Sequence, residues 1–336
     1  MSRSLKPRPA LAGKTFVQTP FAAALTRRAC AWRRRWDGSG HPIFASWIDG
    51  IYPDFRAVAE DAVRVDEVRL HDYAAAVTSS QAFALNLFLP FRDGPRDSLA
   101  DALAPLLGER VAIERVAFEW VPPGALLGEI DGDRPRSGEP ATGVDAVLWA
   151  RRPSGGRCAV LLEVKLGEGG FTPCGGRESA GNQRPDVCAS AATFLAETQS
   201  CYLRRPVRKR RDRRYWTIFA EAHGSVANAF PGIDLQGPCP FAGQAQQPMR
   251  NLALARALEQ EGSVERAWFG LCAHDENPDV AAHWAGWRGL LRDPGEAPVL
   301  TASAVIAAGR AAGHGGWADW MEARYWLGRM SDEGRP

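Results

Sequence analysis

An almost uninterrupted apolar run at residues 158–166, CAVLLEVKL, is the feature that most limits how this chain can fold. Such a short apolar run between turn-forming residues is typical of a strand that is buried on both faces of a sheet. Glu163 and Lys165 are its only charged residues, and they share one face because side chains alternate along a strand. Charged groups in such a place need a partner or a function, so this run is the first candidate for a site.

Residues 143–151, GVDAVLWAR, indicate a second strand, which the turn PSGGR at 153–157 joins to the first. Two strands separated by so short a turn are typical of a hairpin. The hairpin is short enough to bring Asp145 alongside Glu163. We therefore expect two carboxylates and one ammonium group at the surface of a single strand pair.

The rest of the chain alternates between helical and extended patterns. Residues 110–121, RVAIERVAFEWV, and 264–273, VERAWFGLCA, are predicted strands, and residues 215–221, YWTIFAE, fit either a strand or a helix. Apolar spacing and capping residues predict helices at 54–66, 71–89, 97–107 (which Pro105 could end early), 188–203, 245–261, 284–291 and 317–327. We predict one α/β domain at residues 51–330 with a helical section at its N-terminal side. Residues 1–50 are predicted to form a partly irregular arm with one short helix.

Two carboxylates beside a lysine suit metal-assisted hydrolysis of a phosphodiester. Mg²⁺ binds proteins through one or two carboxylates, while water and substrate phosphate complete its shell. Asp145 and Glu163 are the predicted ligands of Mg²⁺ or Mn²⁺, with the carbonyl of Val164 as a further ligand. Lys165 is predicted to position the attacking water and to stabilise charge on the phosphate. The alternative is that Glu163 and Lys165 are the solvent-facing half of an ordinary strand.

The segments GVDAVLW and LLEVK, joined by a Gly-containing turn, resemble the Asp…Glu-x-Lys motif of the PD-(D/E)xK nuclease superfamily, whose fold is restriction-endonuclease-like. Val144 stands where the superfamily motif often has a proline. Further segments resemble the PGN_0703-like group of that superfamily, in order over about residues 70–327: SSQAFALNLFLPF, VAFEW, CPFAGQAQQPMRN, LALARAL and WADWMEARYWL.

This resemblance implies a mixed central sheet flanked by helices, a dependence on Mg²⁺ and a nucleic-acid substrate, in particular DNA. Asp145, Glu163 and Lys165 match the motif residue by residue. Glu119, in VAFEW, is similar to an upstream acidic residue that helps to bind the metal. The alternative, which we weigh equally, is that Glu119 is a strand residue that faces solvent. The expected activity is a nuclease, and the alternative is a non-catalytic nucleic-acid-binding protein of the same fold.

Polar and basic residues later in the chain are candidates for substrate binding. Gln247 and Asn251 share a face of the predicted helix 245–261 because they are four residues apart, and Arg250 lies beside them. The resemblance implies that this helix start approaches the phosphate, where the helix dipole favours an anion. The alternative is an ordinary exposed helix start. A basic run at 204–214, which includes Arg208, Lys209 and Arg210, is predicted to follow a phosphate backbone unless it is simply a solvated loop.

Four of the seven cysteines follow the central strand within 66 residues: Cys174, Cys188, Cys201 and Cys239. Four thiolates could hold Zn²⁺ or an iron–sulfur cluster. The spacing contains no C-x-x-C pair, so free cysteines in a reducing compartment are the alternative.

The composition says more about the compartment and the source of the protein than about its chemistry. The net charge of +2 neither requires nor excludes a polyanionic partner. The odd number of cysteines argues against a complete disulfide framework, and no segment is apolar enough to predict a membrane span or a signal. We expect a cytoplasmic protein without a membrane partner, and a homodimer remains open. The Ala-, Arg-, Gly- and Pro-rich composition indicates a bacterial source.

Overall fold

The apolar run at 158–166 forms the middle strand of a five-stranded sheet. The computed structural model describes residues 18–123, 126–129, 141–204 and 213–327. Its strands are β1 (Ala112–Trp120), β2 (Val144–Arg151), β3 (Arg157–Lys165), β4 (Arg266–Ala273) and β5 (Val299–Thr301), and they lie side by side in that order. The pairs β1–β2 and β2–β3 are antiparallel, whereas the pairs β3–β4 and β4–β5 are parallel. The predicted mixed α/β sheet is therefore confirmed.

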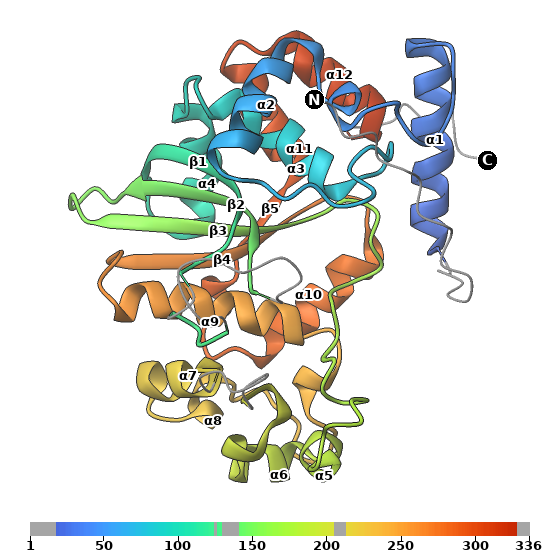
Figure 1. Cartoon of the computed structure of the whole chain (residues 1–336). Coiled ribbons are helices and arrows are strands. Elements are labelled where there is room, and N and C mark those ends of the chain that lie inside the picture. Colours follow the sequence, from blue (N-terminus) through green and yellow to red (C-terminus); the bar gives the residue numbers. More distant parts are fainter. Residues whose placement is uncertain (1–17, 124–125, 130–140, 205–212, 328–336) are drawn as a thin grey trace.

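Helices cover both faces of this sheet (Figure 1). One side carries α1 (Pro20–Trp36), α2 (Arg56–Val65), α3 (Ser80–Phe88), α4 (Asp97–Leu107), α11 (Ala302–Ala311) and α12 (Gly315–Tyr325). The other side carries α9 (Gln246–Gln260) and α10 (Pro278–Leu290), and beyond them α5 (Pro185–Ala189), α6 (Ala191–Ala196), α7 (Tyr215–His223) and α8 (Val226–Ala229). Short 3₁₀ helices are η1 (Trp47–Gly50), η2 (Pro53–Phe55), η3 (Leu89–Phe91), η4 (Thr198–Ser200), η5 (Tyr202–Arg204), η6 (Pro240–Ala242) and η7 (Pro294–Glu296).

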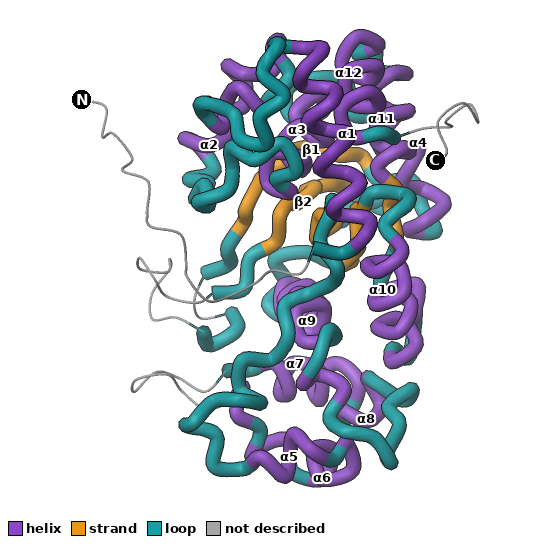
Figure 2. Tube along the Cα trace, turned by 90° about the vertical axis from the view of Figure 1, so that its right-hand side faces the viewer, coloured by secondary structure: helices purple, strands orange, loops and turns teal. Residues whose placement is uncertain are grey.

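Residues 171–204 and 213–242 form a small peripheral unit, which we call the α5–α8 lobe. Figure 2 shows this lobe at the far side of α9 from the strands. No helix among the described residues is both long and apolar enough to cross a membrane.

The sheet separates two hydrophobic cores, and alternation along β3 decides which residue enters which core. Val160, Leu162 and Val164 pack into the core shared with α3, α4 and α11. Ala159 and Leu161 pack into the core shared with α7, α9 and α10. Glu163 and Lys165, which continue the second series, therefore lie on the side of the sheet that α9 covers.

Helix α3 is buried along almost its whole length, because every residue from Gln81 to Phe88 is buried. Ser79 begins the helix by accepting a hydrogen bond from the Ala82 N–H at 3.2 Å. Asn86 is completely buried, and its side chain satisfies the Tyr52 N–H and the Gly50 carbonyl at 2.9 Å each. This fully enclosed helix provides a rigid support for one side of the strands.

Three predicted helices differ from the structure, and the one expected at 284–291 begins earlier, at Pro278. The helix expected at 71–89 begins only at Ser80, because residues 71–79 form turns and Ala76 makes a bridge with Ile43. The single helix expected at 188–203 was wrong: Ser190 is extended, and its side chain accepts a hydrogen bond from the Thr193 N–H at 3.2 Å. A serine placed in this way starts a new helix instead of continuing the old one.

The remaining differences from the predicted elements are small or concern segments whose sequence pattern was ambiguous. Pro105 does not end α4, which continues to Leu107 and ends at Gly108 in the left-handed region, with φ +77°. Residues 215–221, which fitted a strand or a helix, are helical in α7. The short β5 and helix α11 were not predicted. The N-terminal helix is present and begins at Pro20.

Candidate active site

The predicted hairpin brings Asp145 and Glu163 together. β2 pairs with β3 through Ala146 and Leu162, so the next position places Asp145 opposite Glu163. Asp145 Oδ2 accepts a hydrogen bond from the backbone N–H of Val164 at 2.6 Å. The N–H and C=O of one strand residue point to the same side. The Val164 carbonyl therefore also faces the side on which Asp145 lies.

Glu119 extends this row of carboxylates onto β1. It lies one position beyond the pair Phe118–Ala146, and so opposite Asp145. Its φ of +46° is unusual for a residue other than glycine, and such backbone outliers cluster at functional sites. Gln81 Nε2 on α3 donates a hydrogen bond to Glu119 Oε1 at 2.9 Å. Glu119 is thus held by a neighbouring helix, and it does not simply face solvent from a strand.

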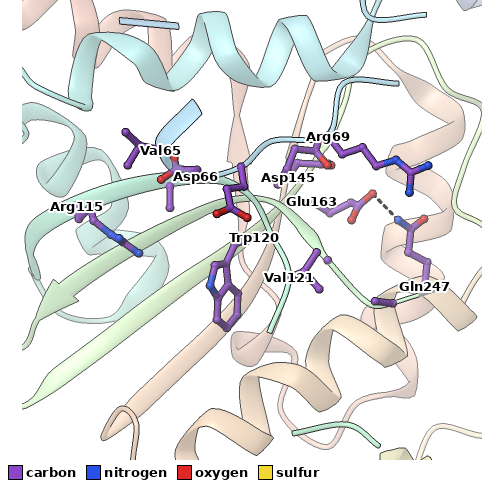
Figure 3. A pocket seen from close by; sticks show the side chains of 14 residues that line it. Val65, Asp66, Arg69, Arg115, Trp120, Val121, Asp145, Glu163 and Gln247 are labelled. Carbon is purple, nitrogen blue, oxygen red and sulfur yellow. Dashed lines mark hydrogen bonds between the residues drawn. The ribbon is translucent and has the colours of Figure 1, made fainter. Parts of the chain in front are cut away.

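Glu163 is only 2% exposed, and three side chains hold its carboxylate. Lys165 Nζ lies 2.7 Å from Glu163 Oε1. Gln247 Nε2 donates to the same oxygen at 2.6 Å (Figure 3). Asn251 Nδ2 donates to Glu163 Oε2 at 3.0 Å. The structure thus brings the first turns of α9 onto the site, and the two residues predicted to share a helix face both contact Glu163.

Negative charge is crowded in this row. Burial, followed by the carboxylate of Glu163, raises the pKa of Glu119 to about 7, although the hydrogen bond from Gln81 acts in the opposite direction. Burial and the charges of Glu163 and Glu119 raise the pKa of Asp145 well above its usual range. A single ammonium group does not balance these carboxylates.

Lys165 carries that ammonium group. Burial acts to lower the pKa of Lys165, but the surrounding carboxylates, led by Glu163 and followed by Glu168 and Asp145, together raise it above its usual value. Lys165 therefore stays protonated across the neutral pH range.

A divalent cation suits this charge and this set of donors. Among the described residues, no group of three or more His, Cys, Asp or Glu side chains is arranged to hold a metal ion. The protein ligands available at the row are the carboxylates of Asp145 and Glu163 and the carbonyl of Val164. A small set of oxygen ligands that leaves positions for water and phosphate is typical of Mg²⁺, whereas Zn²⁺ prefers a closed set of nitrogen and sulfur ligands.

The row opens into a pocket of about 730 Å³ (Figure 3). Besides the acidic residues, Arg69, Arg115 and Trp120 line it. Trp120 packs edge-to-face against Trp149, with ring centroids 5.3 Å apart. These basic and aromatic residues were not predicted as site residues. Arg115 could have been found, since it shares a strand face with Glu119 by alternation, whereas Arg69 carries no local signal.

Arg250 belongs to a different network from Gln247 and Asn251. Its guanidinium donates to Glu129 Oε1 at 3.0 Å and to Thr142 Oγ1 at 2.9 Å, and the hydroxyl of Tyr215 also donates to Glu129. In this arrangement Arg250 ties α9 to the segments 126–129 and 141–143. The structure therefore places it in a buried tether and not at the carboxylate row.

The basic residues Arg208, Lys209 and Arg210 lie outside the described residues.

All seven cysteines are free of disulfides. The four that were predicted to bind metal lie in the α5–α8 lobe, where Cys201 and Cys239 are buried and Cys174 and Cys188 are partly buried. Among the described residues, no group of three or more of these cysteines is arranged around a single metal ion.

Comparison with known proteins identifies the family. A family model described as "Restriction Endonuclease associating with ARP" matches residues 47–326, a range that includes all five strands and the carboxylate row. No curated protein and no solved structure matches the chain. This match confirms the restriction-endonuclease-like resemblance of the sequence, while the resemblance to the PGN_0703-like group stays a prediction. The chain therefore belongs to the family of restriction endonucleases associating with ARP.

Proposed function

We propose that this protein is a Mg²⁺-dependent nuclease of the PD-(D/E)xK type that hydrolyses phosphodiester bonds in DNA. The observation that carries the proposal is the placement of Asp145 opposite Glu163, with Lys165 2.7 Å from Glu163, beside an open pocket. Membership of a restriction-endonuclease family supports the reaction class.

The residues of the row have distinct roles in this proposal. Asp145, Glu163 and the Val164 carbonyl would hold Mg²⁺, which when bound polarises the phosphate and lowers the pKa of water. Gln247 and Asn251 fix the orientation of the Glu163 carboxylate through their hydrogen bonds to its two oxygens. Pre-oriented ligands of this kind lower the cost of assembling the site when substrate arrives.

Lys165 would act as a cation and not as a general base. Its raised pKa keeps a proton on Nζ at neutral pH, so the amine has no lone pair with which to remove a proton. A fixed ammonium group can orient the attacking water and stabilise the charge that develops on the phosphate.

The pocket supports a nucleic-acid substrate because its wall combines positive charge with an aromatic surface. Arg69 and Arg115 are exposed there, and arginine binds phosphate through well-oriented hydrogen bonds. Trp120 is partly exposed beside Glu119. Exposed aromatic rings stack on nucleic-acid bases in a sequence-tolerant way. We infer that the arginines contact the backbone while Trp120 contacts a base near the scissile phosphate.

The direct test is cleavage of double-stranded DNA, single-stranded DNA and RNA by the full chain with Mg²⁺, with Mn²⁺ or with EDTA. We expect DNA cleavage only when a metal is present. Lys165→Met should lower the rate by about 10²-fold, since it removes the ammonium group while keeping much of the side-chain volume. Arg110→Met, which changes an exposed cation that pairs with Asp97 and Asp101, is the control and should cleave as wild type does.

Metal-independent rates, or equal rates for Lys165→Met and wild type, would count against the proposal. Salt-sensitive DNA binding without cleavage of any substrate would support a non-catalytic nucleic-acid-binding protein instead.

Trp120→Ala should weaken DNA binding with little change in kcat. One lost base stack corresponds to a roughly 10-fold higher Kd. Binding can be measured with Ca²⁺ in place of Mg²⁺, and kcat and KM with Mg²⁺. Trp36→Ala is the matched control, because Trp36 is 51% exposed on α1 and does not line the pocket. Equal Kd values for both variants would remove Trp120 from the binding site.

A further inference from the structure

Four cysteines that the proposed nuclease site does not use gather in the α5–α8 lobe. They come from four separate segments of the chain. Cys174 lies in the loop after β3, Cys188 in α5, Cys201 between η4 and η5, and Cys239 immediately before η6. None of them forms a disulfide.

Direct contacts hold the segments of Cys188, Cys201 and Cys239 around the loop of Cys174. The backbone N–H of Cys239 donates to the carbonyl of Cys188 at 3.2 Å. Asn182, from the loop that carries Cys174, places its Nδ2 3.5 Å from Cys188 Sγ.

The same loop also packs against Tyr202, the residue that follows Cys201. Ser179 Oγ donates to the Tyr202 hydroxyl at 2.9 Å, and Gly176 lies so close to the Tyr202 ring that a side chain would not fit. The four cysteines are therefore brought together by contacts between their segments, and not by closeness in the sequence.

Backbone N–H groups are directed at three of the sulfurs in a repeated way. The Gly176 N–H donates to Cys174 Sγ at 3.3 Å, from two positions further along the chain. Burial raises the pKa of Cys201 to about 11, and the hydrogen bond from the Leu203 N–H, again two positions along, acts against this rise. N–H groups arranged in this way stabilise thiolates, which are the form that binds metal.

The thiols also act on one another. Burial raises the pKa of Cys239 to about 12, the Phe241 N–H opposes the rise, and the nearby thiols of Cys201 and Cys188 add to it. Burial is the largest cause that raises the pKa of Cys174, and the nearby thiol of Cys188 raises it further. These thiol–thiol interactions agree with the contacts that bring the segments of the four cysteines together.

The lobe has little regular structure of its own. Helices α5, α6 and α8 have five, six and four residues. Helices this short are not stable in isolation, so such a lobe needs tertiary packing or a cross-link. Aromatic packing among Phe194, Trp216 and Phe241 supplies part of that stability. A metal centre would connect four segments that no disulfide connects.

We propose that Cys174, Cys188, Cys201 and Cys239 ligate an iron–sulfur cluster that cross-links the α5–α8 lobe. Four thiolates are the usual ligand set of [2Fe–2S] and [4Fe–4S] clusters. A single Zn²⁺ needs all four sulfurs at about 2.3 Å from one point, and the described side chains offer no such group. A cluster of several irons separates its thiolates more widely, which agrees with cysteines that are neighbours without converging on one ion.

The test is anaerobic purification of the full chain, followed by measurement of iron, acid-labile sulfide and zinc per chain and by visible absorption. We expect a brown protein with iron and sulfide in equal amounts. Cys188→Ala and Cys201→Ser should each lose most of the iron. Cys272→Ala is the matched control, because Cys272 is buried in β4 outside the lobe, and this variant should retain wild-type iron.

A second measurement keeps the test valid if a lobe variant does not fold. In wild-type protein the four lobe cysteines should resist alkylation until a chelator and an oxidant remove the cluster, after which all four should react. Absence of iron and sulfide after anaerobic purification and after reconstitution with ferrous iron and sulfide would overturn the proposal. Stoichiometric zinc in place of iron, or wild-type iron content in Cys188→Ala, would overturn it as well. These readouts do not depend on nuclease activity.

Discussion

Asp145→Asn is expected to lower metal-dependent DNA cleavage by about 10²- to 10³-fold while the protein stays folded. Asparagine has nearly the same shape, and its amide oxygen can still accept the hydrogen bond that the Val164 N–H makes with Asp145. The substitution removes one of the two carboxylates that face each other across β2 and β3. The loss should appear in kcat at saturating Mg²⁺ and DNA, with DNA binding largely retained.

Asp101→Asn is the matched control for this substitution. Asp101 is an exposed residue of α4 that pairs with Arg110 at 2.6 Å, on the opposite side of the sheet from α9. The variant should cleave at the wild-type rate. A similar rate for both variants, whether high or low, would mean that Asp145 has no special role in the reaction.

The metal-free protein is expected to lose stability from its carboxylate row as the pH rises through neutrality. The pKa of Glu119 is raised to about 7 in the folded chain from an ordinary value of 4.5, chiefly by burial. The folded state therefore binds this proton more tightly than the unfolded state does. The contribution of Glu119 to the free energy of unfolding is fully present below about pH 4.5. On the order of 3 kcal/mol of it is lost as the pH rises through about 7.

Glu119→Gln isolates this contribution from other titrating groups. His274 changes stability with the opposite sign, because its pKa is lowered, with burial as the largest cause. Urea unfolding of both proteins without metal at about pH 5 and about pH 8 should show the variant gaining stability relative to wild type at the higher pH only. Addition of Mg²⁺ should reduce that gain. A difference that is the same at both pH values would contradict the raised pKa.

The core of the site could be predicted from the sequence because its determinants are local. Glu163 and Lys165 share a face through the two-residue period of a strand, and a short turn at 153–157 leaves little freedom in where Asp145 pairs. Helical spacing likewise predicted that Gln247 and Asn251 point in one direction. These relations do not depend on the rest of the fold, and for this reason the structure reproduces them.

Relations that depend on distant segments could not be predicted in the same way. Glu119 reaches Asp145 through the pairing of β1 with β2, which are joined by a long connection at 121–143 that carries no register signal. Arg250 is adjacent to the Gln247–Asn251 face, yet the buried carboxylate of Glu129 pairs with it, and no local pattern shows that Glu129 is buried. The packing of the α5–α8 lobe likewise depends on contacts among four separate segments.

The most direct test of the central claim is an anomalous diffraction map from crystals of the protein soaked with Mn²⁺. We expect an anomalous peak between the carboxylates of Asp145 and Glu163, and loss of that peak in crystals of Asp145→Asn. Protein that cleaves DNA with Mn²⁺ but shows no peak at these two carboxylates, or binds Mn²⁺ only elsewhere, would contradict it.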